Sequence, residues 1–369
     1  MNVPDLALRR AAAPDRRHDQ AGVTLVELMV TIAINLLLVL AATLLYLNTR
    51  NTQKAVDERG AVFESGQLAL DLLGREIGNA AFYPAVSVEP AAGGQAAGNN
   101  VLWSHDLATT QSMTTVPAAY RHGVFGCSGE RFDVGASGCS PHTNATGPAG
   151  SDALVVSYFT NDAFSLDRGQ RADCTYADVA NSALNAGRER AAGGATGTGT
   201  GTAAAAAGAL GVAPDAPLLV VNRYQLVPRQ FQVDGVAVNT FSLACSGNGR
   251  ADGAYQELIR GVEQFVVRYG VMDDATLRPN RYLTASQVTA LGDTTSIDGV
   301  VYPAWRRVVS VRVCLLVRST SGTALRTATN GQAAAITDCS GSSYTPPNGA
   351  QVRRFEQVFS VKNRQSNAV

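Results

Sequence analysis

Charged residues are scarce in this sequence: Asp, Glu, Lys and Arg make up 16% of its 369 residues, and 30 basic residues balance 30 acidic ones. A protein that binds nucleic acid normally has a basic excess or a clustered basic face. The sequence has neither, so we expect no nucleic-acid partner. Hydrophobic residues, at 46%, supply enough apolar material for one large core or two smaller ones.

The sequence also lacks the motifs of an active site or a metal centre. Its four histidines (His18, His105, His122 and His142) form no H-E-x-x-H motif, and there is no nucleophile elbow, P-loop or dinucleotide-binding glycine pattern. No cysteine lies in a C-x-x-C pair or at metal-ligand spacing from a histidine. We therefore expect no catalytic residue, no metal site and no cofactor, and we expect the protein not to be an enzyme.

A long apolar run follows a polar start. Residues 23–47 read VTLVELMVTIAINLLLVLAATLLYL, with Glu27 as the single charge, and about 25 such residues can cross the ~30 Å hydrocarbon core as a helix. An ordinary signal peptide has a shorter apolar region, of about 7–15 residues, and would be cut near residues 40–42. A plain signal anchor explains the length but not Glu27, because a charge at the bilayer centre costs about 2.5–3.5 kcal/mol.

A third interpretation accounts for the glutamate. Residues 21–30, AGVTLVELMV, resemble the type IV prepilin processing motif, a glycine followed by an apolar stretch with glutamate at its fifth position. The resemblance implies that a prepilin peptidase cuts between Gly22 and Val23 and methylates the new terminus at Val23. It also implies that the new amine and Glu27 neutralise each other, within one subunit or with a neighbour, because a paired charge in low dielectric costs less than a lone one.

An amphipathic stretch extends the apolar run. Its apolar residues recur at steps of seven, seven, three and four: Val56, Phe63, Leu70, Leu73 and Ile77. This spacing places them on one stripe of a helix and predicts a single helix over about 24–79. The charged residues, Glu58 among them, are expected mostly off that stripe. Four glycines weaken the helix by up to ~1 kcal/mol each: Gly60, Gly66, Gly74 and Gly78.

Beyond Pro84 the pattern changes to short apolar runs separated by Gly, Asn, Asp and Pro, which predicts strands and turns. The predicted strands are 153–159, 218–226, 230–233, 241–244, 258–269, 305–317 and 353–361. Gly- and Ala-rich segments at 91–100 and 186–212 are predicted to be loops or linkers. The expected fold class is α+β: a long N-terminal helix, membrane-embedded in its first half, packed on an antiparallel β-rich, pilin-like globular domain.

Six cysteines are scattered along the chain: Cys127, Cys139, Cys174, Cys245, Cys314 and Cys339. An even number of widely spaced cysteines behind an export-type N-terminus indicates disulfides in an oxidising compartment. Six cysteines allow fifteen full pairings, and the sequence does not select one. Our prediction pairs chain neighbours, 127 with 139, 174 with 245 and 314 with 339; alternatively, some are small buried apolar residues.

Two further segments are similar to those of PilW-type minor pilins. Residues 72–82, LLGREIGNAAF, resemble the R-E-I segment at the end of their helix, and residues 257–271, ELIRGVEQFVVRYGV, resemble their L-V-x-G-V-E-x-F-x-V-x-Y-G segment. The resemblance covers about 21–83 and 215–364. The expected organisation is a cleaved leader (1–22), a transmembrane and assembly helix (23–48), its amphipathic continuation (49–83), a loop-rich insertion (84–214) and a β-rich pilin-like domain (215–369).

The resemblance implies a minor pilin that takes part in initiating and assembling a type IV pilus. The implied partners are other minor pilins, the major pilin, the prepilin peptidase and the inner membrane. The implied location is a single pass through the inner membrane with a periplasmic globular domain, either there or at the pilus tip. Two alternatives stay open: a minor pseudopilin of a type II secretion system, and a membrane-tethered periplasmic adhesin or enzyme with 84–214 as its ligand region.

Overall fold

The structure is a computed structural model that describes residues 24–82, 86–87, 101–102, 116–143, 150–160, 172–179, 182–185, 218–233, 236–272, 279–295, 301–320, 335–346 and 350–365. The chain forms two units, Met1–Ala55 and Val56–Val369. The predicted leader, the processing site at Gly22 and Val23, and the predicted loops at 91–100 and 186–212 lie outside the described residues.

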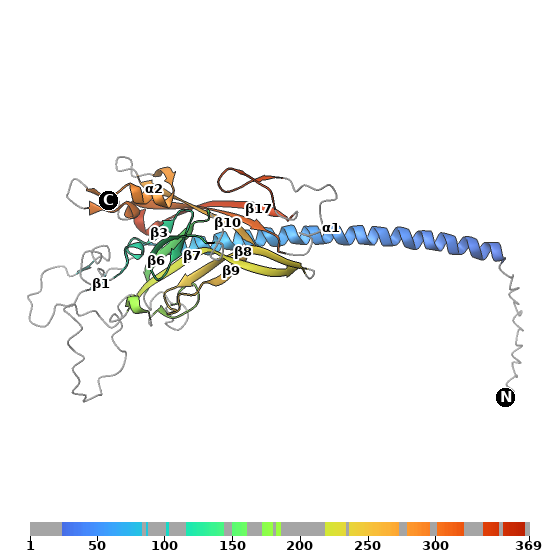
Figure 1. Cartoon of the computed structure of the whole chain (residues 1–369), viewed down its shortest axis with the longest axis horizontal. Coiled ribbons are helices and arrows are strands. Elements are labelled where there is room, and N and C mark those ends of the chain that lie inside the picture. The colour runs from blue at the N-terminus through green and yellow to red at the C-terminus, as the bar shows by residue number, and fades with distance from the viewer. Residues whose placement is uncertain are drawn as a thin grey trace, which may run out of the picture. The chain divides into compact units, whose positions relative to one another are not determined.

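One helix, α1 (Leu25–Asn79), runs through the end of the first unit into the second (Figure 1). Its bounds agree with the helix predicted over 24–79. In the first unit the helix forms no core, because every side chain from Thr24 to Arg50 is exposed. Among the described residues, α1 is the one helix long and apolar enough to cross a membrane.

The second unit is built on two antiparallel sheets. The five-stranded sheet has the order β3 (Val124–Cys127), β6 (Ala153–Thr160), β7 (Leu218–Val233), β8 (Val236–Gly247), β9 (Gln256–Arg260). The four-stranded sheet has the order β11 (Pro279–Leu283), β10 (Val262–Met272), β14 (Val308–Arg318), β17 (Val352–Ser360). A long helix with an antiparallel β-rich unit confirms the predicted α+β class. The first sheet combines strands from 84–214 with strands from 215–369.

Short elements complete the unit. Four two-stranded pairs are present among the described residues: β1 (Val86–Ser87) with β2 (Val101–Leu102), β4 (Glu130–Asp133) with β5 (Gly138–Pro141), β12 (Thr294–Thr295) with β13 (Val301–Tyr302), and β15 (Ile336–Thr337) with β16 (Ser343–Tyr344). The helices are α2 (Ala285–Ala290) and α3 (Lys362–Gln365), and the 3-10 turns are η2 (Ala118–Tyr120), η5 (Ala183–Asn185) and η6 (Ala304–Arg307).

Several strand predictions were wrong at their boundaries. The predicted strand 305–317 begins only at β14, because residues 305–307 belong to η6, and the predicted strand 241–244 is the middle of the longer strand β8. The predicted strand 258–269 is two strands in different sheets, because Gly261 breaks it with a φ of +72°, and a Cβ there would lie 2.6 Å from the Arg318 carbonyl oxygen. The predicted strands 218–226 and 230–233 form the single strand β7. Pro228 is tolerated within it, since β6 pairs with β7 only as far as Tyr224, which leaves position 228 at a sheet edge.

The second part of α1 buries an apolar face, but not the whole predicted stripe. Leu70, Leu73 and Ile77 are at most 3% exposed, as expected. Val56 and Phe63 are 59% and 45% exposed, so the prediction was wrong for these two residues.

The buried face is centred one residue earlier along the helix than predicted. Val62 and Ala69, seven residues apart, take the places expected for Phe63 and Leu70, and Leu70 is buried as well. Glu58 is buried on the same side, four residues before Val62, although it was expected off the stripe. Sequence periodicity favoured the larger apolar side chain of Phe63, whereas the structure buries the smaller Val62 and Ala69 in the main hydrophobic core.

Two glycines of α1 make room for side chains of the strand β17. A Cβ at Gly66 would lie 2.5 Å from Cδ2 of Phe355, and a Cβ at Gly74 would lie 2.5 Å from Cε1 of Phe359. Eight helical residues rise about 12 Å. Four strand residues rise about 13 Å. The two spacings therefore match, and each ring meets a glycine. Gly60 and Gly78 have no such neighbour within 4 Å.

Candidate functional site

The start of α1 is capped by Thr24. Its Oγ1 accepts a hydrogen bond from the Glu27 backbone N–H at 3.3 Å, and its carbonyl oxygen accepts one from the Leu28 N–H at 3.1 Å. This N-cap geometry places Glu27 in the first turn, where the helix dipole favours a negative charge. The Glu27 side chain is exposed. The T-x-x-E spacing of Thr24 and Glu27 is a sequence signature of a helix N-terminus. Our sequence analysis placed the start of the helix correctly but did not use this signature.

The apolar part of α1 contains hydroxyls that bond to their own helix. Thr31 Oγ1 donates to the Leu28 carbonyl at 2.9 Å, and Thr43 Oγ1 donates to the Val39 carbonyl at 2.7 Å. These bonds satisfy the hydroxyls without a partner chain. An apolar exposed surface remains along the segment, together with the Glu27 carboxylate. Such a surface is suited to lipid or to other apolar helices.

Near the other end of α1, Glu76 meets the five-stranded sheet. Asn222 of β7 donates from Nδ2 to Glu76 Oε2 at 2.7 Å. Burial raises the pKa of the Glu76 carboxyl above its ordinary value, while hydrogen bonds with Asn222 and Tyr224 oppose that rise and the charge of Asp173 adds to it. Glu76 belongs to the R-E-I segment singled out in the sequence, but its role in joining helix and sheet was not predicted.

The last turn of α1 is closed by the C-terminal end of the chain. Asn363 Nδ2 donates to the carbonyl oxygens of Gly78, Asn79 and Ala80 at 3.3, 3.3 and 3.0 Å. Helix ends leave carbonyls without partners inside the helix, and this side chain serves three of them. The helix end is thus fixed to the segment that follows β17.

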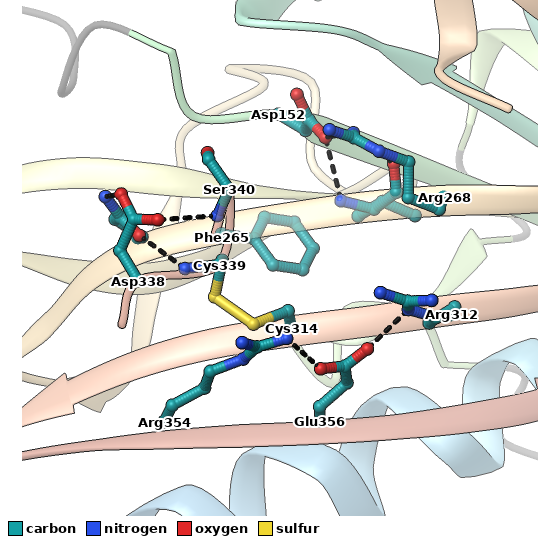
Figure 2. Close-up of a disulfide and its surroundings, with 12 residues drawn as sticks. Asp152, Phe265, Arg268, Arg312, Cys314, Asp338, Cys339, Ser340, Arg354 and Glu356 are labelled. Atoms are coloured by element: carbon teal, nitrogen blue, oxygen red, sulfur yellow. Dashed lines mark hydrogen bonds and ion pairs between the residues drawn. A yellow bond between two sulfur atoms is a disulfide. The ribbon is translucent and has the colours of Figure 1, made fainter. Parts of the chain in front are cut away.

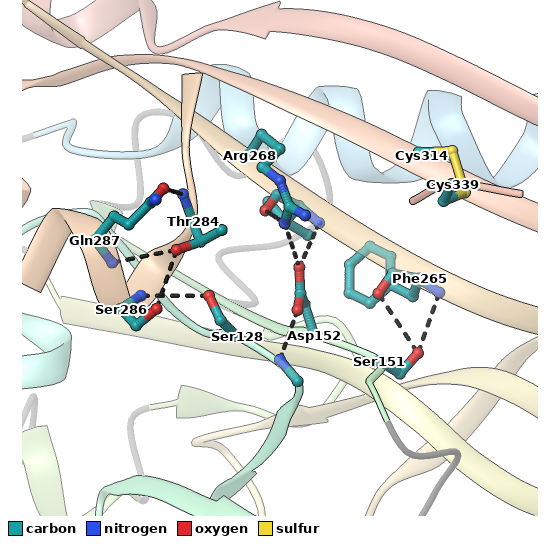
Figure 3. A network of polar contacts seen from close by, with 12 residues as sticks. Ser128, Ser151, Asp152, Phe265, Arg268, Thr284, Ser286, Gln287, Cys314 and Cys339 are labelled. Carbon is teal, nitrogen blue, oxygen red and sulfur yellow. Dashed lines mark hydrogen bonds and ion pairs between the residues drawn. A yellow bond between two sulfur atoms is a disulfide. The ribbon is translucent and has the colours of Figure 1, made fainter. Parts of the chain in front are cut away.

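The two sheets are joined at β10 by a short polar segment (Figure 3). The Phe265 N–H donates to Ser151 Oγ at 3.1 Å, the Val267 N–H donates to Asp152 Oδ2 at 2.7 Å, and the Asp152 N–H donates to the Phe265 carbonyl at 2.8 Å. The strand β11 pairs with β10 only from Tyr269 onward. Ser151 and Asp152 therefore satisfy backbone groups of β10 that would otherwise lack a partner.

Burial also affects Asp152. It raises the pKa of this carboxyl, although hydrogen bonds from the Val267 and Gly129 N–H groups and the charge of Arg268 oppose the rise. The Arg268 guanidinium lies 3.4 Å from Asp152 Oδ2. Figures 2 and 3 both show this pair beside β10.

Three disulfides join the chain neighbours predicted from the sequence. Cys127 is bonded to Cys139, Cys174 to Cys245, and Cys314 to Cys339, with Cα–Cα distances of 5.5, 6.4 and 5.7 Å. Figure 2 shows the third beside the ion pairs that Glu356 makes with Arg312 and Arg354. All six cysteines therefore form disulfides, and none is a free thiol.

The described residues bring together no group of three His, Cys, Asp or Glu side chains that could hold a metal ion. His142 lies with Nε2 3.0 Å from the Ser151 carbonyl oxygen, a contact that fixes a loop. His105 and His18 lie outside the described residues.

Comparisons with known proteins give matches to two parts of the chain, one near the N-terminal end of α1 and one in the β-rich unit. The family described as Type IV Pilus-assembly protein W matches residues 230–363, from β7 to α3. The prokaryotic N-terminal methylation motif matches residues 17–43, which include Thr24 and Glu27. Searches of curated proteins and of solved structures found no matching relative. In its apolar N-terminal helix and its C-terminal sheets, the chain thus matches a PilW-type, pilin-like protein related to the type IV pilus.

Proposed function

We propose that this chain is a minor pilin that takes part in initiating or assembling a type IV pilus, and that it docks with other pilins through the apolar part of α1. The observation that carries the proposal is the exposed apolar surface of that helix, with Glu27 in its first turn, inside the matched methylation motif. The role is structural and requires no catalysis.

Docking would proceed by exchange of lipid contacts for helix contacts. Apolar helices gain little from leaving lipid as such, so association relies on side-chain packing and on polar groups that find partners. Glu27 is such a group. A prepilin peptidase that cuts between Gly22 and Val23 would create an amine close to it, and the two charges would neutralise each other within one subunit or between neighbours.

The three disulfides support a periplasmic place for the globular unit. Disulfides persist in oxidising compartments such as the bacterial periplasm and are rare in the cytosol. Anchoring by α1 in the inner membrane would leave the sheets on that side. The unit would then enter the fibre, or prime it, from the periplasmic face.

A single substitution tests the docking role. We expect Glu27→Ala to reduce the number of surface pili while the protein stays in the membrane fraction, because the charge is removed but the apolar run is intact. Glu64→Ala is the matched control, since Glu64 is an exposed glutamate of the same helix beyond the apolar run. Normal piliation in the Glu27 variant would overturn the proposal. Normal pili with loss of protein secretion would identify a pseudopilin of a type II secretion system instead.

Processing is tested separately. The mature protein extracted from membranes should begin at Val23 and carry one extra methyl group by intact mass. A water-soluble protein that begins near Ala42 would show that an ordinary signal peptidase removes the helix.

A further inference from the structure

An amide lies at the centre of the apolar run. Asn35 has twelve residues of the run on either side, between Val23 and Leu47. From Ile32 to Ala42 all other residues are apolar. If this part of α1 crosses the membrane, as the proposed function requires, Asn35 lies near the middle of the hydrocarbon core, about 18 Å from each end of the run.

The Asn35 amide has no partner within the described residues. The neighbouring hydroxyls of Thr31 and Thr43 donate to carbonyls of their own helix, but the Asn35 side chain makes no hydrogen bond. Its side chain is exposed. An amide in hydrocarbon without a hydrogen bond is strongly unfavourable, and no water is available there to supply one. The helix therefore requires a partner at this depth.

We propose that the partner is a second copy of this chain, and that two parallel α1 helices pair in the membrane through their Asn35 side chains. An asparagine amide both donates and accepts, so two such groups can bond to each other. Two copies inserted in the same direction place their amides at the same depth. One asparagine in an apolar seam is a known means of fixing the register of paired helices.

The residues around Asn35 form a seam that suits this contact. Positions three and four apart lie on the same side of the helix: Leu28, Thr31, Asn35, Leu38, Ala42 and Leu45. Ala42 is small enough for a close approach of the two helices, and Thr31 is already satisfied on its own helix. Contact between Asn35 and the Glu27 carboxylate of another copy would instead require a stagger of eight residues, about 12 Å along the axis.

Cysteine cross-linking in membranes tests the pairing, because the native cysteines are all in disulfides and an introduced cysteine is the one free thiol. Two differently tagged copies of the full chain carry Leu38→Cys, on the Asn35 side of the helix, or Leu37→Cys, about 200° from Asn35 around it. Oxidation should join the two tags at position 38 several-fold more than at position 37. Equal yields at the two positions would overturn the proposal.

Substitution of the amide gives the second arm. Asn35→Leu should lower the cross-linked fraction at position 38 by about 3- to 30-fold in apparent pairing constant, the range expected for one hydrogen-bonded contact between membrane helices. Asn35→Gln should retain the pairing, and Thr43→Val should leave it unchanged. An Asn35→Leu variant that cross-links as well as the parent, or a position-38 cysteine that joins only to another pilin, would overturn the proposal.

The arms separate this inference from the proposed function. A chain that is extracted from membranes by alkaline carbonate refutes the membrane anchor, and both proposals with it. A chain that resists extraction, supports piliation and shows no preference for position 38 refutes the pairing through Asn35 alone.

Discussion

The ring of Phe355 occupies the space that a side chain at Gly66 would need, and the same relationship recurs eight residues further along α1, between Phe359 and Gly74. The strand β17 therefore packs against the helix through two phenylalanine–glycine contacts, which lie about two helical turns apart. The Gly66 contact continues outward, since the Phe63 ring lies 6.1 Å from that of Phe355 and the Arg353 guanidinium lies 5.0 Å over Phe63.

Gly66→Ala and Gly74→Ala should therefore destabilise the globular unit. The added methyl must displace a phenylalanine ring in a packed core, which costs about 1–3 kcal/mol. Part of that loss, up to ~1 kcal/mol, is recovered through higher helix propensity. Thermal unfolding of the full chain in detergent measures the net effect. Gly60→Ala is the control: nothing lies within 4 Å of it, so we expect equal or higher stability. Identical effects at 60, 66 and 74 would contradict the contact with β17.

Glu76→Gln should flatten the dependence of stability on pH. Because burial raises the Glu76 pKa in the folded chain above the ordinary value of 4.5, the folded state holds this proton to higher pH than the unfolded state. The stabilisation is fully present below the unfolded pKa and is lost as pH rises through the folded pKa. The melting temperature of the variant should thus fall less between pH 4 and pH 8 than that of the parent.

A residual pH dependence and a control variant help to interpret the melting profile of Glu76→Gln. Part of the pH dependence should remain in the Glu76 variant, because burial also raises the pKa of Asp152. Glu64→Gln, at an exposed position of the same helix, should leave the profile unchanged. A profile for Glu76→Gln that runs parallel to that of the parent would show that the carboxyl is not buried against β7.

Loss of a disulfide should lower the free energy of unfolding more when the bonded cysteines close a longer loop of chain. The sequence separations are 12, 71 and 25 residues for the bonds of Cys127, Cys174 and Cys314. Chain entropy then predicts losses of about 3, 4.5 and 3.5 kcal/mol, respectively, for paired alanine substitutions. Denaturant unfolding of the three double variants checks the order. A smaller loss for the Cys174–Cys245 variant than for the Cys127–Cys139 variant would contradict it.

Asp152→Ala should weaken the junction between the sheets. It removes the acceptor for the buried Val267 N–H and for the partly buried Gly129 N–H. A buried group left without a partner costs about 1–3 kcal/mol. We expect a lower melting temperature and faster amide exchange in β10. Asp252→Ala is the control, because Asp252 is an exposed partner of Arg250 and its loss should leave β10 unaffected. Unchanged exchange at Val267 in the Asp152 variant would contradict this assignment.

Local signals in the sequence were sufficient for the helix, the fold class and the position of the longest strands, but not for the short strands. The apolar run and the absence of proline between Val23 and Pro84 set the bounds of α1, and alternating apolar runs located β6, β14 and β17. Tertiary contacts decided the rest. The division of 258–269 depends on the approach of the Arg318 carbonyl to Gly261, which lies 57 residues away in sequence.

The candidate site was predicted less completely, for the same reason. The roles predicted for Gly22, Val23 and Glu27 depend on a local motif and stay predictions, whereas the neighbour pairing of the cysteines agrees with the structure. Glu76 depends on Asn222, 146 residues further along the chain, and so leaves no periodic signal. Helix propensity alone predicts that Gly66 and Gly74 weaken the helix. Their packing role is not visible in the local sequence, because their phenylalanine partners come nearly 300 residues later.

The contact of Asn363 with the end of α1 implies that the helix is synthesised long before its packing can be completed. The helix leaves the ribosome before the residues that complete its packing, because Asn363, which closes its last turn, follows Ala80 by 283 residues and comes after the strand whose rings fill its glycines. The growing chain would thus be held by its apolar segment while the globular unit still lacks an edge strand. A nascent chain stopped at residue 350 should remain open to protease until the missing segment is supplied.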